Sequence, residues 1–133
     1  MAEPPPTPAP LGTRHWPTEI RLRQAEKILE IDFDNGVTFR LPAELLRVES
    51  PSAEVQGHGP KQKQLVAGRA QVGIISLEPV GNYAVRIVFD DLHDTGIYSW
   101  SYLYELGERQ QELWDAYLKG LAAHGLSREP ARH

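Results

Sequence analysis

The sequence predicts an α+β domain in which an antiparallel β-sheet, built from hairpins, is covered by C-terminal helices. Three observations predict this class. Apolar and charged residues alternate in several short segments before residue 90, as they do in strands with one buried face. Asn35-Gly36 separates two of these segments, and this dipeptide is a strong hairpin signal. Apolar residues then recur at helical spacing over the last part of the chain.

The length and the prolines predict how the chain is divided. A chain of 133 residues suits one domain, and its 41% apolar content is enough for a modest core. Six of the eleven prolines lie in residues 1–17, which we expect to form a disordered tail. We expect residues 18–125 to form the domain and residues 126–133 to form a frayed tail.

Charge and cysteine content narrow the class of function. The formal net charge of −4 disfavours a nucleic-acid-binding protein, which usually has a basic face. The absence of cysteine excludes disulfides, thiolate zinc sites and a cysteine nucleophile. The sequence has neither a signal-peptide pattern nor an apolar run of about 20 residues, the length that a membrane span requires. We therefore expect a cytoplasmic protein that does not bind membranes.

Three predicted strands open the domain. Each alternates apolar with polar or charged side chains, which is typical of a sheet that is covered on one face. They span residues 18–23, 28–33 and 37–41. Pro42 ends the third strand, because proline lacks a backbone N–H. We expect residues 43–47 to form a short helical turn.

A second hairpin follows later in the chain. Its strands are predicted over residues 72–77 and 83–90. Alternate residues of the later strand form an apolar face, from Tyr83 to Phe89. We expect Val72, Ile74 and Ser76 to lie opposite this face as cross-strand partners.

Two helices complete the predicted domain. Ser99 is a suitable N-cap for the first helix, and Gly107 is expected to interrupt it. The second helix is predicted over residues 108–124, with Gly125 as its C-cap. Its apolar stripe should lie across the sheet.

A long polar segment, residues 53–71, separates the two predicted hairpins. It contains Gly57, His58 and Gly59, and the two glycines would allow the backbone to approach a ligand or a neighbouring segment closely. The segment lacks the spacing of a phosphate-binding loop. A mobile recognition loop and an ordinary solvated loop are both compatible with its composition.

The richest group of polar side chains lies where the last strand gives way to the first helix. It consists of Asp90, Asp91, His93 and Asp94. A metal site here would need another ligand, such as His58, because neighbouring residues of a strand point to opposite faces. The structural alternative is that Asp91 or Asp94 caps a turn while His93 bonds to the backbone. We expect the imidazole to lie near solvent, because the charges on either side of it resist burial.

Partner or ligand binding is the other hypothesis for these residues. The proposed contact residues are Gly57, His58, Gly59, Asp91, His93, Asp94 and Trp100. His93 and Trp100 are expected to belong to one surface. A hydrolase is not indicated, because no strained Gly-x-Ser-x-Gly turn surrounds Ser99. We therefore predict no catalytic residues.

Three stretches of the sequence resemble a known family. They are LRVESPSAEV at residues 46–55, GHGP at residues 57–60, and FDDLHDTGIYSW at residues 89–100 with Leu103. Together they are similar to the gamma-butyrobetaine-hydroxylase-like N-terminal domain, over roughly residues 18–125. In this family the domain precedes the catalytic domain of carnitine-synthesis dioxygenases, stands alone in bacteria, or is attached to scaffolds of iron–sulfur cluster assembly. The iron and 2-oxoglutarate chemistry of the dioxygenases resides in a second domain that this sequence does not contain.

The resemblance also implies where this sequence departs from the dioxygenases. There, a zinc ion is held by three cysteines and one histidine, and His93 matches that histidine. The corresponding loop here has Ser50 and Ser52, and the chain has no cysteine. The resemblance therefore does not carry the zinc site over, and we predict no metal and no cofactor.

Two hypotheses of function follow. The first is a small non-enzymatic interaction or accessory module with a protein partner, serving a metabolic or iron–sulfur-assembly enzyme. The alternative is a metal- or small-ligand-binding protein that uses His58, His93 and nearby carboxylates. Convergence of the two histidines would favour the alternative.

Overall fold

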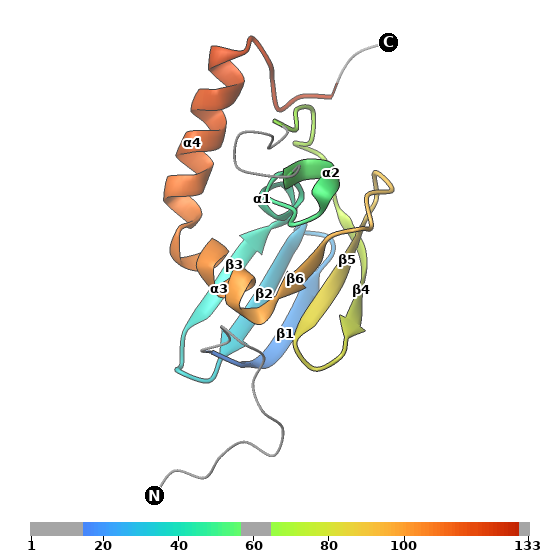
Figure 1. Ribbon diagram of the computed structural model, residues 1–133, viewed down its shortest axis with the longest axis vertical. Helices are drawn as coiled ribbons and strands as arrows, with labels where there is room; N and C mark the ends of the chain where they lie inside the picture. The colour runs from blue at the N-terminus through green and yellow to red at the C-terminus, as the bar shows by residue number, and fades with distance from the viewer. Residues whose placement is uncertain (1–14, 57–64, 131–133) are drawn as a thin grey trace, which may run out of the picture.

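The computed structural model describes residues 15–56 and 65–130, so His58, its two flanking glycines and most of the predicted N-terminal tail lie outside the described residues. In chain order the elements are β1 (Pro17–Arg23), β2 (Ile28–Phe33), β3 (Thr38–Pro42), α1 (Ala43–Val48), α2 (Ala53–Gln56), β4 (Ile74–Val80), β5 (Ala84–Phe89), β6 (Ile97–Ser99), α3 (Trp100–Glu108) and α4 (Gln110–Ala123). They form two three-stranded antiparallel sheets, β1-β2-β3 and β4-β5-β6, with helices after them (Figure 1). The predicted α+β class is confirmed.

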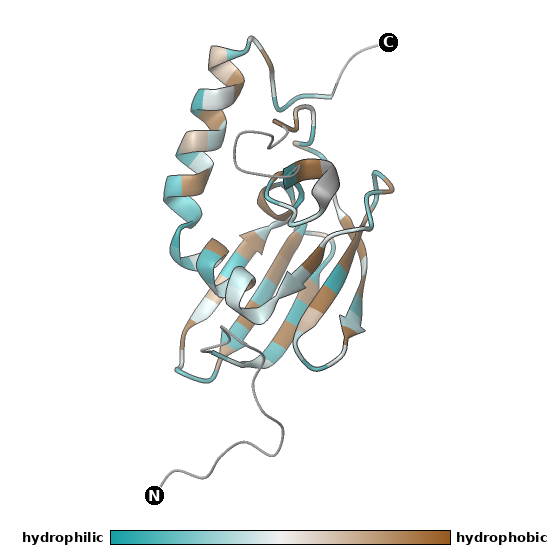
Figure 2. Cartoon of the chain, viewed as in Figure 1, coloured by the Kyte–Doolittle hydropathy of each residue, from teal (hydrophilic) through white to brown (hydrophobic). Residues whose placement is uncertain are grey.

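The sheet β1-β2-β3 has the predicted apolar and charged faces, and brown and teal residues alternate along its strands in Figure 2. Its inner face buries Leu29, Ile31, Phe33 and Leu41. On its outer face Glu30 accepts hydrogen bonds from Arg21, Arg23 and Arg40. The bonds from Arg21 and Arg23 hold the pKa of Glu30 below its ordinary value. The charged side chains of this outer face therefore pair with one another.

The sheet β4-β5-β6 contains a β-bulge that the alternation pattern does not predict. Ile74 pairs with Phe89, but the register shifts before Ser76. Ser76 therefore pairs with Val88, and Leu77 takes the core-facing position opposite the buried Ile87. The prediction that Ser76 faces the core is wrong, because the extra residue at the bulge reverses the faces of the residues that follow it.

The first of the long helices begins as predicted. The Ser99 hydroxyl accepts a hydrogen bond from the Tyr102 amide at 3.1 Å, which caps α3. The prediction that Gly107 interrupts the helix is wrong: Gly107 lies inside α3, and the break before α4 falls at Arg109. Among the residues that the structure describes, no helix has the length and apolar content needed to span a membrane.

Gly107 is inside the helix because α3 crosses the sheet there at close range. A Cβ at this position would lie 2.3 Å from Cγ of Phe39. Gly107→Ala should therefore lower the free energy of unfolding by about 1–3 kcal/mol through overpacking. Gly120→Ala in α4 is the matched control, because its Cβ would lie 3.4 Å from a Leu65 methyl group. Urea unfolding should show a gain of about 0.5–1 kcal/mol for the control, and equal effects of the two changes would contradict the close packing.

The segment predicted to be a frayed tail makes specific contacts as far as Pro130. The amides of Gly68 and Ala70 donate to the carbonyls of Ser127 and Arg128, each at 2.9 Å. Figure 1 shows this segment returning from the end of α4 toward the chain that precedes β4. Residues 126–130 therefore pack against the fold.

Candidate functional site: the Asp90–Asp94 turn

A tight turn connects the end of β5 to the chain that leads into β6. The Leu92 amide donates to the Phe89 carbonyl at 3.1 Å, and the Phe89 amide donates to the His93 carbonyl at 3.0 Å. Leu92 lies between these bonds with a φ of 74°, in the left-handed region that bulky side chains rarely adopt. Its side chain is 84% exposed. The turn thus presents a leucine to solvent in a strained backbone conformation.

The carboxylate of Asp91 stabilises this turn. One carboxylate oxygen accepts a hydrogen bond from the His93 amide at 3.1 Å, and the other accepts one from Nε of Arg47 at 2.8 Å. Nε of Arg69 lies 2.7 Å from that second oxygen, as an ion pair without an aligned hydrogen bond. Burial opposes ionisation of Asp91, but the amide and the two arginines together hold its pKa below the ordinary value. Of the structural alternative, the part in which Asp91 caps the turn is confirmed, whereas the His93 ring bonds to the side chain of Ser50.

His93 is buried, so the expectation that its imidazole lies near solvent is wrong. The residue is 5% exposed, and Nε2 lies 2.9 Å from the Ser50 hydroxyl oxygen. Its ring packs against Phe89 at a centroid distance of 6.0 Å. The hydrogen bond to Ser50 offsets the loss of water around the imidazole. The charges of Asp90 and Asp94 do not prevent this, because Asp90 is exposed and Asp94 lies beside Arg86.

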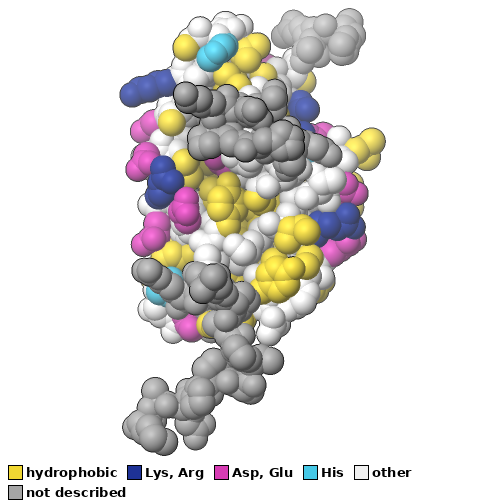
Figure 3. Space-filling model, in the orientation of Figure 1, with side chains coloured by type: hydrophobic (Ala, Val, Ile, Leu, Met, Phe, Trp, Pro, Cys, Tyr) yellow, Lys and Arg dark blue, Asp and Glu magenta, His cyan; other side chains and the backbone are white. Residues whose placement is uncertain are grey.

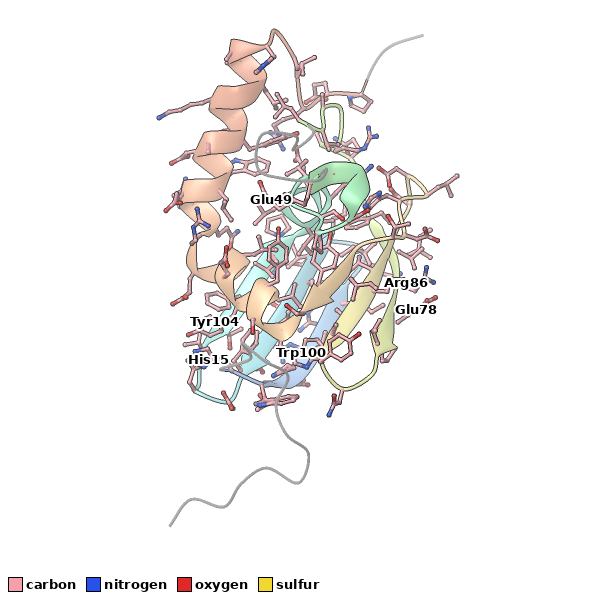
Figure 4. All side chains as sticks on the ribbon, viewed as in Figure 1. His15, Glu49, Glu78, Arg86, Trp100 and Tyr104 are labelled. Carbon is pink, nitrogen blue, oxygen red and sulfur yellow. The ribbon has the colours of Figure 1, made fainter. Side chains whose placement is uncertain are left out.

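Trp100 is also buried and lies at the opposite end of β5 from His93. Its amide donates to the Tyr83 carbonyl at 3.2 Å, and its indole N–H donates to the Asn82 carbonyl at 2.9 Å. His93 instead bonds to Phe89 at the other end of the strand. The expectation that His93 and Trp100 belong to one surface is therefore wrong. Trp100, labelled in Figure 4, closes the turn between β4 and β5.

Asp94 is engaged on the outer face of the second sheet. Its carbonyl accepts a hydrogen bond from Nη1 of Arg86 at 3.1 Å, and its carboxylate lies 3.4 Å from the same nitrogen. Arg86 also bonds to Glu78 of β4, and this pair is labelled in Figure 4. Ile97 is the β6 partner of Arg86 and is 46% exposed. Figure 3 shows hydrophobic side chains grouped over this part of the molecule.

Hydroxyl groups join the loop after α1 to the chain between His93 and β6. Ser52 and Thr95 share a hydrogen bond of 2.7 Å, and Ser50 bonds to His93. Gly96 lies so close to this loop that a Cβ on it would be 2.5 Å from the Ser50 hydroxyl. Sequence reasoning missed these pairs because the partners lie 43 residues apart.

These residues do not fit the zinc ion that the resemblance associates with related proteins. Zinc prefers thiolates, imidazoles and carboxylates. The loop supplies neutral hydroxyls instead, and the one imidazole is bonded to Ser50. Within residues 15–56 and 65–130, no group of three or more histidine or acidic side chains is placed to hold a metal. Hydrogen bonds from Ser50 and Ser52, and no set of metal ligands among the described residues, join this loop to the β5–β6 connection.

Removal of metal should therefore leave the stability unchanged. We expect thermal unfolding curves recorded with and without a strong chelator to coincide, because the loop is joined to the β5–β6 connection by hydrogen bonds. Addition of zinc to the chelator-treated protein is the control. A chelator-induced fall in Tm that zinc reverses would contradict this prediction.

The comparisons with known proteins agree with the fold. The family model described as "Gamma-butyrobetaine hydroxylase-like, N-terminal" matches residues 20–104. No curated protein matches. Two proteins with NMR solution structures are similar at a TM-score of 0.78: one is 46% identical, over 91% of this chain and 95% of the other, and the second is 50% identical, over 93% and 92%.

A crystal structure gives a third similarity. It is of a protein from Acidithiobacillus ferrooxidans ATCC 23270 described as having unknown function and belonging to the DUF971 family. It is 41% identical, with a TM-score of 0.58 over 68% of this chain and 91% of the other. The family match spans well over half of the sequence and ends in the middle of α3. The chain belongs to the gamma-butyrobetaine hydroxylase-like N-terminal domain family.

Proposed function

We propose that this domain is a small non-enzymatic interaction module, and that Leu92 is its principal contact residue. One observation carries the proposal: Leu92 is 84% exposed while its backbone has a φ of 74°. Glycine or asparagine would relieve this conformation, which costs other residues about 1–2 kcal/mol. A leucine here adds exposed apolar surface to backbone strain. Both costs are explained if the side chain enters a pocket on a partner.

The turn is built to hold Leu92 in place. Asp91 bonds to the His93 amide on one side and pairs with Arg47 and Arg69 on the other. His93 is in turn anchored to Ser50. A side chain on such a rigid support loses little conformational entropy on binding, which favours affinity. In this proposal Asp91 and His93 support the contact residue instead of touching the partner.

The surroundings of Leu92 suggest the chemistry of the partner. Asp90 beside it is exposed and acidic, so a matching surface would have an apolar pocket with a basic rim. The proposed partner is a protein in the cytoplasm, and a metabolic or iron–sulfur-assembly enzyme is the class that the family resemblance supports. Gly57, His58 and Gly59 lie outside the described residues, so their part in the contact stays a prediction.

Metal or small-ligand binding gains no support from the described residues. It required His93 to present its imidazole together with other ligands. That imidazole is buried against Phe89 and bonded to Ser50. We therefore propose no second function.

Replacing Leu92 should separate binding from stability. We expect Leu92→Asn to leave the free energy of unfolding unchanged or to raise it by up to about 1 kcal/mol, because asparagine tolerates the left-handed region. The same change should remove a specific protein from an affinity capture with the tagged domain. Leu118→Asn on the exposed side of α4 is the matched control, because Leu118 is also exposed. Retention of the whole captured set by the folded Leu92→Asn protein would contradict the proposal.

A further inference from the structure

A second site lies where the C-terminal segment meets α1 and α4. Nε and Nη2 of Arg128 donate to the two carboxylate oxygens of Glu44 at 2.9 and 2.7 Å. The guanidinium carbon lies 5.2 Å from the centre of the Trp114 ring. Glu44 thus forms a two-point ion pair with the guanidinium, and Trp114 offers its aromatic face to the same group.

The groups that accept the arginine and the arginine itself differ in burial and in secondary structure. The Glu44 side chain is 7% exposed and belongs to α1, and Trp114 belongs to α4. The Arg128 side chain is 43% exposed and comes from a segment without regular structure. The acceptor half is therefore part of the fold, whereas the arginine is supplied by a segment on the surface.

Arg128 does not fill the space in which it lies. A hollow of about 310 Å³ remains beside it. Besides Glu44, Trp114 and Arg128, the hollow is lined by Pro42, Leu45, Gln110 and Gln111. Its walls combine apolar surface with two amide side chains that can donate and accept hydrogen bonds. The hollow leaves room for further atoms of a bound segment beside the arginine.

The backbone around the site is suited to an extended segment. The amides of Gly68 and Ala70, two residues apart, donate to successive carbonyls of Ser127 and Arg128. Two main-chain bonds and one side-chain anchor are the elements by which a strand-like peptide is commonly recognised. In the isolated chain the C-terminal segment makes both kinds of contact, the two main-chain bonds and the arginine anchor.

We propose that Glu44, Trp114 and the amides of Gly68 and Ala70 form a binding site for an arginine in an extended segment of a partner protein, and that Arg128 occupies this site in the isolated chain. A buried carboxylate needs a cation, because an unpaired charge in this position is strongly unfavourable. Arginine fits better than lysine, since only its planar fork bonds to both oxygens while stacking on the indole. The partner's arginine therefore replaces Arg128 in the same geometry.

The test uses the full-length chain with Arg128→Lys, which keeps a cation beside Glu44 but loses the fork. The probe is the blocked peptide Ser-Arg-Glu-Pro, which has the sequence of residues 127–130. NMR follows the indole N–H signal of Trp114 during the titration. We expect a saturable shift and binding about tenfold tighter than that of the peptide with lysine in place of arginine. Wild-type protein should bind the arginine peptide about tenfold more weakly than Arg128→Lys, because the peptide must displace Arg128.

Glu44→Gln combined with Arg128→Lys is the matched control, since it removes the carboxylate charge with little change in shape. Saturable binding should be lost in this protein. The proposal would be overturned by the absence of a saturable shift in both the wild type and Arg128→Lys, by equal affinity for the two peptides, or by unchanged binding in the control. A wild-type dimer that Arg128→Ala abolishes would also overturn it, in favour of exchange of the segment between two copies of the chain.

Discussion

Asp91→Ala is expected to lower the free energy of unfolding by about 2–3 kcal/mol, which is less than for a fully buried ion pair because the Asp91 side chain is 20% exposed. The change would leave the guanidinium groups of Arg47 and Arg69 without their shared carboxylate, and the Arg47 side chain is only 10% exposed. It would also remove the bond to the His93 amide that closes the turn. Urea unfolding at neutral pH measures the loss.

Asp90→Ala is the matched control for this prediction. Asp90 is the preceding residue of the same turn, but it is exposed. Its replacement should change the free energy of unfolding by no more than about 0.5 kcal/mol, as surface substitutions usually do. Similar losses for the two alanine variants would show that the ion pairs of Asp91 contribute little to the turn.

Phe89→Ala is expected to cost about 3–5 kcal/mol, because it opens a cavity next to His93 in the core. His93→Ala should cost about 2–3 kcal/mol, since it leaves the Ser50 hydroxyl buried without its imidazole partner and also removes packing. Urea unfolding of both variants, with Leu92→Asn for comparison, should rank them in this order: Phe89, His93, Leu92. A loss for His93→Ala no larger than that for a surface change would show that the Ser50–His93 bond does not stabilise the fold.

The first sheet could be predicted from the sequence because its signals are local. The alternation along β2 places Leu29 and Ile31 on one face, and Asn35-Gly36 fixes the turn to β3. The start of α3 can also be predicted from the sequence, because Ser99 caps it through a hydrogen bond within one turn. In these regions the residues that determine each element lie close to one another in the sequence.

The second sheet and α3 depend on contacts that neighbouring residues do not reveal. The bulge before Ser76 shifts which residues face the core: the inward position after Ile74 is Leu77, a step of three residues that a strict alternation does not predict. The sequence predicts a break at Gly107 because glycine lowers helix propensity. It remains helical because the ring of Phe39, from β3, occupies the space where a side chain would lie.

The candidate site shows the same limit. The carboxylates around His93 predict an exposed imidazole. A hydrogen-bond partner 43 residues away, Ser50, allows the imidazole to be buried instead. Leu92 cannot be identified from the sequence, because a single apolar residue between Asp91 and His93 gives no chemical signal of its own. Only its backbone conformation and exposure single it out. Those two properties are absent from the sequence.

Photo-crosslinking from position 92 tests most directly whether this turn is a docking element. A photoreactive amino acid would replace Leu92 in one full-length variant and Leu118 in a matched control, since both side chains are exposed. After irradiation in cells of the source organism, we expect position 92 to form a covalent adduct with one protein, and position 118 to form none with that protein. The same pattern of adducts from both positions, or none from position 92 in a folded protein, would contradict the proposal that Leu92 is the contact residue.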